Sequence, residues 1–218
     1  MKNTPNNHFE KQTSLNNTIL CGIDEVGRGC LAGPVVTAAA ILKSTRKNSL
    51  IKDSKLLNET QLEKAYSWLI KNSTFAVSII DHRRIDQHNI YQATQISMCR
   101  AYYQLCAVAP VAPKVVLVDA VKLPLNCQVI SLYKGEKESI SIAAASIIAK
   151  VTRDRIMKRL SKSFPLYSLH EHKGYATKIH YKALFAQGSS PMHRMSFLKN
   201  YQQALLKQIN TQIELFEP

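Results

Sequence analysis

Shortly after its start the chain reads Gly22-Ile23-Asp24-Glu25-Val26-Gly27-Arg28-Gly29, where an apolar run meets two carboxylates and a glycine-rich turn. Adjacent carboxylates repel each other unless a cation or a proton lies between them. Neighbours on a strand point to opposite faces, so Asp24 and Glu25 can share a cation only if the backbone bends there. Gly27 and Gly29 favour such a bend. We therefore expect a strand that ends at a divalent-metal site.

Strand and helix patterns are mixed along the rest of the chain. Asn58 and Gln61 form a capping pair that predicts the start of a helix, and apolar residues recur at helical spacing from Ile90 until Pro110. The expected strands cover residues 18–23, 35–42, 74–80, 115–118 and 128–133, and the expected helices begin near Asn58, Ile90 and Ser139. The last helix runs to about Lys162. This mixture predicts an α/β domain.

Two further acidic residues follow expected strands. Asp119 comes directly after residues 115–118, and Glu136 lies in the expected turn Lys134-Gly135-Glu136. Taken singly, Asp119 is more typical of a turn or a helix cap, and a charged turn is normally solvated. Together with the adjacent pair, they form a set of oxygen ligands suited to Mg²⁺ or Mn²⁺. Two such ions activate a water and stabilise the leaving oxygen in phosphodiester hydrolysis.

The charge balance favours a polyanionic partner. Lysine and arginine number 29 against 15 acidic residues, a formal net charge of +14. A field of that sign and size is typical of nucleic-acid-binding proteins. The alternative is a basic protein whose charge serves only colloidal stability.

The rest of the composition indicates the cellular compartment in which the protein works. The 218 residues are 45% hydrophobic, enough for a core without disulfides, and the five cysteines are odd in number and show no zinc-ribbon spacing. The polar start, residues 1–17, contains no signal-peptide pattern, and no later run is long and apolar enough to span a bilayer. We expect a cytoplasmic protein.

Five motifs stand together in the order and near the spacing of a known family. They are the stretch from Gly22 to Gly29, Asp53-Ser54-Lys55-Leu56, the run from Ile142 to Asp154, His172-Lys173-Gly174-Tyr175 and His193-Arg194-Met195-Ser196-Phe197. On these residues the chain closely resembles type 2 ribonuclease H, also called ribonuclease HII, from about Thr18 to Lys199.

The resemblance implies a fold and an activity. The fold is a ribonuclease H-like mixed sheet flanked by helices over residues 18–163, with a flexible segment before it and a helical C-terminal extension, residues 164–218, packed on it. The activity is endonucleolytic cleavage of RNA in RNA/DNA hybrids and at single ribonucleotides in DNA, leaving a 5′-phosphate and a 3′-hydroxyl. We expect a monomer that needs Mn²⁺ or Mg²⁺.

The resemblance also assigns the metal ligands. The four metal-binding acids of the family correspond to Asp24, Glu25, Asp119 and Glu136. The family usually has Asp at the last position, and the extra methylene of Glu136 moves the carboxylate by on the order of an ångström. Glu138 and Asp154 are the acids that would substitute if Glu136 were not a ligand.

Substrate contacts are implied at three places. Gly27-Arg28-Gly29 would contact the 2′-hydroxyl at the RNA/DNA junction, and Tyr175 the sugar of the deoxynucleotide that follows. Ser54 and Lys55 resemble the phosphate-contacting pair of the family. Without the resemblance, these residues indicate only a tight turn, a half-buried tyrosine and a solvated lysine.

The C-terminal end contains a possible docking peptide. Gln212-Ile213-Glu214-Leu215-Phe216 resembles the short peptides by which bacterial replication proteins bind the sliding clamp, although an ordinary helix end explains the same residues.

The sequence leaves two rival functions open. The first is a junction resolvase, but that function does not explain why Gly27-Arg28-Gly29 occurs together with Tyr175. The second is a non-catalytic nucleic-acid-binding protein, in which the acids would repel the phosphate backbone.

Overall fold

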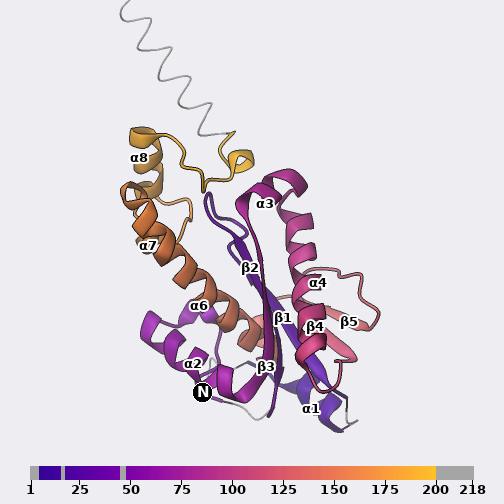
Figure 1. Ribbon diagram of the computed structural model, residues 1–218. Helices are drawn as coiled ribbons and strands as arrows, with labels where there is room; N and C mark the ends of the chain where they lie inside the picture. The colour runs from indigo at the N-terminus through magenta and orange to yellow at the C-terminus, as the bar shows by residue number, and fades with distance from the viewer. Residues whose placement is uncertain (1–4, 16–17, 45–47, 200–218) are drawn as a thin grey trace, which may run out of the picture.

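A five-stranded mixed sheet forms the centre of the molecule (Figure 1). The computed structural model describes residues 5–15, 18–44 and 48–199. The strands are β1 (Leu20–Val26), β2 (Val35–Leu42), β3 (Ser73–Ile80), β4 (Val115–Asp119) and β5 (Gln128–Leu132). Their order is β3-β2-β1-β4-β5; β1, β2 and β3 are antiparallel, whereas β4 and β5 run parallel to β1. The predicted mixed sheet flanked by helices is confirmed.

The first strand is longer at its C-terminal end than the sequence suggested. We expected a strand over residues 18–23, but β1 continues to Val26 because its last residues pair with Val36 to Ala38 of β2. The two carboxylates therefore lie within β1. Gly22 lets this strand approach helix α6 (Ile140–Ser163), because a Cβ there would lie 2.2 Å from the Ser141 carbonyl carbon.

Helices α2 (Glu59–Asn72) and α6 cover one face of the sheet (Figure 1). The capping pair predicted for α2 is present: the Asn58 side chain accepts from Gln61 N at 2.9 Å, and the Gln61 side chain accepts from Asn58 N at 3.0 Å. Small residues of α6 lie against the alanines of β2 in one buried cluster. That close packing presses the N-terminal half of α6 against the strand with the acidic pair.

The opposite face is covered by α4 (Ile90–Val108), which follows the short helix α3 (His82–His88). Met98, Ala101 and Leu105 of α4 are fully buried and pack against β1, β2 and β4. As predicted, the helix ends just before Pro110. Within the described residues, no helix is long and apolar enough to cross a membrane.

Residues 8–15, which we expected to belong to a flexible segment, form helix α1. Its buried Glu10 reaches the start of α6, where Oε1 accepts from Ser139 Oγ at 2.5 Å and from Ser141 N at 3.0 Å. A carboxylate is favoured at a helix N-terminus, where backbone N–H groups lack partners within the helix. This tertiary contact holds α1 in place despite its polar sequence.

The described part of the C-terminal extension packs on the end of α6. It contains α7 (Leu169–His172) and α8 (Lys178–Gln187), with short 3₁₀ turns at Pro165–Tyr167 and Met195–Phe197. Figure 1 shows α7 and α8 beyond the C-terminal end of α6. Apolar residues of this segment share one cluster with Leu31 and Met157.

Candidate active site

Four acidic side chains line one cavity of about 550 Å³ at the edge of the sheet where β1 and β4 end: Asp24, Glu25, Asp119 and Glu136. The topology explains why two of them, Asp24 and Asp119, lie together. β1 and β4 are parallel, and Ile23 pairs with Val118, so the next residue of each strand, Asp24 or Asp119, reaches the same edge. Residues far apart in the chain thus supply one site.

The backbone bend that we expected between the adjacent acids lies farther along the chain. β1 stays extended through both residues, and the turn begins at Gly27, with a φ of 94°. Asp24 is buried and Glu25 is half-buried, yet both line the same cavity. The two acids thus share one cavity without a bend between them, and that they share a metal stays a prediction.

Electrostatics make the acidic pair costly without a cation. Burial, followed by repulsion from Glu25 and Glu136, raises the pKa of Asp24 well above its ordinary value. Burial also raises the pKa of Glu25, although the neighbouring Arg28 guanidinium, 3.1 Å from Oε1, opposes that shift. Both shifts mean that the folded protein resists placing full negative charge here.

The fourth acid lies on a helical turn. Residues Gly135–Glu138 form the short helix α5, preceded by Lys134 in a left-handed conformation with a φ of 56°. Gly135 N donates to Asp119 Oδ1 at 3.2 Å, which joins this helix to the end of β4. Glu136 is only 5% exposed. The predicted turn is thus helical and its acid is buried, because the contact with Asp119 joins the segment to the end of β4.

Glu136 is held by the loop that precedes α2. Its Oε2 accepts from Ser54 N at 2.8 Å, and its Oε1 accepts from Lys55 Nζ at 2.9 Å. Burial alone would raise the pKa of Glu136, but these hydrogen bonds and the Lys55 charge outweigh it and lower the pKa. Ser54 and Lys55, predicted as phosphate contacts, lie in the same cavity and bind an acid of the site.

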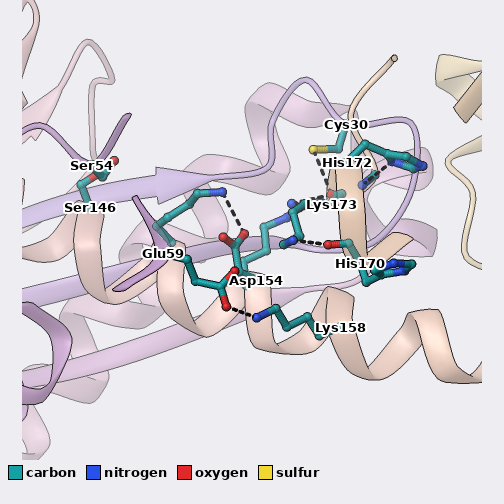
Figure 2. A network of polar contacts seen from close by, with 12 residues as sticks. Cys30, Ser54, Glu59, Ser146, Asp154, Lys158, His170, His172 and Lys173 are labelled. Atoms are coloured by element: carbon teal, nitrogen blue, oxygen red, sulfur yellow. Dashed lines mark hydrogen bonds and ion pairs between the residues drawn. The ribbon is translucent and has the colours of Figure 1, made fainter. Parts of the chain in front are cut away.

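The two substitute acids do not line this cavity. Glu138 is exposed on α5. Asp154 pairs with Lys150 at 2.9 Å on α6, beside the contacts of Lys158 and Lys173 shown in Figure 2. Of the three candidates, Glu136 is the acid that lies beside the other members of the set.

The chemistry of the cavity fits a divalent cation of the Mg²⁺ or Mn²⁺ class. Carboxylate oxygens are the ligands such cations prefer, and the buried Oε2 of Glu25 has no hydrogen-bond partner. Among the described residues, however, no three acidic, histidine or cysteine side chains already stand in metal-ligand geometry. Arg28 and Lys55 hold two of the acids instead. Each of these ion pairs would compete with a cation for one carboxylate oxygen.

The glycine-rich loop and Tyr175 lie together although they are far apart in sequence. Cys30 and Tyr175 form an isolated antiparallel bridge, and Leu31 N donates to Gly174 O at 2.8 Å. A Cβ on Gly29 would meet no atom within 4 Å, so the protein itself leaves open space beside this glycine. The loop and the exposed Tyr175 line the same cavity as the acids.

Two buried arginines position that loop, a role that we did not predict from the sequence. Arg153 donates to Pro34 O, Lys173 O and Ala32 O. Arg194 donates to Gly33 O at 3.0 Å, Arg28 O at 2.8 Å and Gly27 O at 2.7 Å. The sequence contained two signals of this role. Arg153 is a charged residue on an otherwise apolar face of α6, and Arg194 lies inside the motif from His193 to Phe197.

Ser146 and Lys150 of α6 also line the cavity and were missed. Ser146 Oγ lies 2.9 Å from Ser54 Oγ, a contact drawn in Figure 2. The interaction of Ser146 with Asp24 lowers the pKa of that carboxyl and so opposes the effect of burial. The i, i+4 spacing of these two polar residues on an apolar helix was the available signal.

Comparison with known proteins agrees with this geometry. Residues 21–200 match the family model described as Ribonuclease HII. A protein named Ribonuclease HII from Rickettsia bellii is 46% identical over 192 residues, covering 88% of this chain and 95% of the relative.

Two solved structures, both 25% identical to this chain, have the same fold. The PCNA:RNase HII complex from Archaeoglobus fulgidus gives a TM-score of 0.66 over 81% of this chain and 94% of that chain. Bst-RNase HIII in complex with Mn²⁺ gives a TM-score of 0.65, and the match covers 87% of this chain and 70% of that chain. The chain therefore belongs to the ribonuclease HII family and is a ribonuclease H enzyme.

Proposed function

We propose that this enzyme hydrolyses the RNA strand of RNA/DNA hybrids and also cuts at ribonucleotides embedded in duplex DNA, leaving 5′-phosphate and 3′-hydroxyl ends. One observation carries the proposal: the four acids share a cavity with Gly27-Arg28-Gly29 and Tyr175. The same cavity of about 550 Å³ therefore contains groups that can cleave a phosphodiester and groups that can recognise a ribose hydroxyl.

Asp24, Glu25, Asp119 and Glu136 would hold two Mg²⁺ or Mn²⁺ ions. Such ions activate a water for attack and stabilise the leaving oxygen. The Mn²⁺ complex of a structural neighbour supports this choice of ion. The carboxylates would hold these ions, and the charge of the ions would offset the burial and the repulsion that raise the pKa of Asp24.

The other groups of the cavity would position the substrate. Backbone groups of Gly27-Arg28-Gly29 lie where a strand can approach closely, and we assign them the contact with the 2′-hydroxyl. Tyr175 then packs against the next sugar, and Ser54 and Lys55 contact phosphate. Lys55, whose side chain is 79% exposed, can exchange its ion pair with Glu136 for a phosphate oxygen.

A duplex with a single ribonucleotide tests the proposal. With Mn²⁺ or Mg²⁺ we expect a cut beside the ribonucleotide, and with chelator no cut. An all-DNA duplex of the same sequence is the matched control. A bound but uncut duplex would favour a binding protein, and cutting of all-DNA branched substrates would favour a resolvase; either result refutes the proposal.

The junction role of Tyr175 has its own test. Tyr175→Ala should weaken cutting at a single ribonucleotide more than cutting of a long hybrid, while Tyr175→Phe should retain both because sugar packing needs only the ring. The melting temperature serves as the control for folding. Equal losses on both substrates would exclude a junction-specific role.

We also propose that the C-terminal peptide Gln212 to Phe216, which lies outside the described residues, docks on a sliding clamp. The PCNA:RNase HII complex of a structural neighbour supports this idea. Deleting residues 212–218 should abolish binding to a bacterial sliding clamp measured by calorimetry and leave cleavage of short duplexes unchanged. No binding by the intact chain would refute it.

A further inference from the structure

A second cavity, of about 340 Å³, adjoins the active site. Lys55, Asp119 and Glu136 line both cavities, so the two spaces are continuous along one side of the metal centre. The remaining wall of the second cavity comes largely from the segment after β5, where Tyr133 and Lys134 precede α5. None of the substrate contacts assigned above accounts for this wall.

Tyr133 is an unusual side chain for a free surface. At 79% it is the most exposed of the large hydrophobic residues in the described chain. The ammonium group of Lys134 lies 5.0 Å from the centre of its ring. A strand of a duplex presents its sugars and phosphates outward, so a sugar can pack on the exposed ring while a phosphate meets the ammonium group.

The charge of this wall has the sign that a phosphate backbone requires. Asp119 and Glu136 belong to the metal centre, and Asp53 accepts from Lys55 N at 3.1 Å as the cap of a 3₁₀ turn. Lys134 and Lys137 make no ion pair with any residue that the structure describes. These two lysines therefore present free positive charge along the outer side of the cavity.

We propose that Tyr133, Lys134 and Lys137 form a subsite for the strand being cut, binding the nucleotides that flank the scissile phosphate on one side. The proposal rests on the proposed function, because that function places a phosphodiester at the four acids. Continuity with the active site and the positive charge favour a nucleic-acid strand over an apolar protein partner. The subsite would increase affinity for long substrates without touching the reacting atoms.

Kinetics on duplexes of graded length test the aromatic contact. The single ribonucleotide is moved stepwise toward one end and then toward the other. Tyr133→Ala should raise KM about tenfold on long flanks, with kcat unchanged, because the variant removes the packing of a sugar against the ring, a contact that contributes affinity on that order. The difference should vanish when the flank on one particular side is removed. Tyr133→Phe should behave as wild type.

Tyr103→Ala is the matched control, because Tyr103 is also an exposed tyrosine but lines neither cavity. Equal KM values for Tyr133→Ala and wild type at every flank length would overturn the subsite. A wild-type enzyme that cuts none of the duplexes would instead refute the proposed function, so the two failures are distinguishable. Melting temperatures should agree among all variants.

Salt dependence tests the lysines. For each of Lys134→Gln and Lys137→Gln, the slope of log affinity against log salt should fall in magnitude by about one, the loss of one phosphate contact. Affinity is measured by fluorescence anisotropy in an Asp24→Asn background, so that the duplex stays intact. Lys64→Gln, on exposed α2 surface, is the control. Slopes equal to the control would overturn the charge assignment.

Discussion

At the scale of single residues, Glu136 has a longer side chain than the Asp that the resemblance led us to expect, and the structure shows what that length reaches. Its two carboxylate oxygens accept from Ser54 N and Lys55 Nζ. The ammonium group thus neutralises an acid that we assign to the metal centre. A cation arriving at this acid competes with Lys55.

We therefore expect Lys55→Met to bind Mn²⁺ more tightly than the wild type, by about fivefold. An ion pair with one exposed partner contributes roughly 1 kcal/mol, and the variant removes that competition. Isothermal titration calorimetry without nucleic acid measures it, with Lys52→Met from the same loop as control. Weaker binding would mean that Lys55 instead holds Glu136 ready for the metal.

Asp24 should destabilise the metal-free fold. Its pKa is raised by burial and by the neighbouring acids, so the folded protein holds the proton more tightly than the unfolded chain does. Stability is consequently lost as the pH rises through the ordinary carboxyl range up to the raised pKa. Asp24→Asn removes that loss and should gain roughly 1–3 kcal/mol at neutral pH.

Urea unfolding in the presence of chelator measures this gain, which should disappear at low pH, where the wild-type carboxyl is protonated in both states. Glu138→Gln removes an exposed acid from the same part of the molecule and serves as control. Added Mn²⁺ should stabilise the wild type but not Asp24→Asn. A variant less stable than the wild type at neutral pH would contradict the repulsion.

At the scale of elements, helix α1 stabilises the helix that covers the acidic strand. The Glu10 carboxylate accepts from two donors at the start of α6, one of them a backbone N–H. Glu10→Ala should lower the free energy of unfolding by about 2–3 kcal/mol, since hydrogen bonds to a charged group contribute 1.5–3 kcal/mol. Lys11→Ala, exposed on α1, is the control. Equal effects in urea unfolding would show that the cap contributes nothing.

Three histidines join the elements of the C-terminal extension. His172 and His180 stack with ring centres 4.3 Å apart, and His180 Nε2 lies 2.9 Å from His193 Nε2. His180 Nδ1 also lies 2.9 Å from the carbonyl oxygen of Tyr175. Burial, with repulsion between the rings, lowers the pKa of His180 and His193 to about 4.

These histidines should make the extension sensitive to acid. Because their pKa lies below the unfolded value of 6.5, their stabilising effect is complete above that pH and is lost as the pH falls toward about 4. At pH 5 we expect a loss on the order of 2 kcal/mol, measured as a lower hydrogen-exchange protection factor in α8, which corrects for the pH dependence of intrinsic exchange. The exposed His170, replaced by Gln, should leave this pH dependence unchanged. Equal protection factors at pH 7 and pH 5 would exclude the effect.

At the scale of the whole molecule, the predictable features were those with strong local signals. β2 has the bounds expected from its apolar run, and the Asn58 cap marked the start of α2. Asp24 and Asp119 could be placed together because each lies where a buried strand reaches the sheet edge. Local apolar pattern and strand direction were sufficient for these elements.

Other features depend on contacts that no local pattern contains. Helix α1 is polar, and its order depends on the contact of Glu10 with α6. The turn at Glu136 becomes a buried helix because Asp119 accepts from Gly135 N. Arg153 and Arg194 act on backbone carbonyls contributed by distant segments. In each case the partner is known only once the chain has folded.

The strand order also has a consequence for how the chain folds. β1, β2 and β3 form an antiparallel meander within residues 20–80, whereas β4 must join β1 from much farther along the sequence. We expect the meander to form first and β4 docking to be slow, because non-local pairing delays folding. Until then one edge of β1 stays open, and open edges recruit strands from other copies. We therefore expect the charges of Asp24 and Glu25, near the end of that edge, to discourage pairing with other copies until β4 has docked.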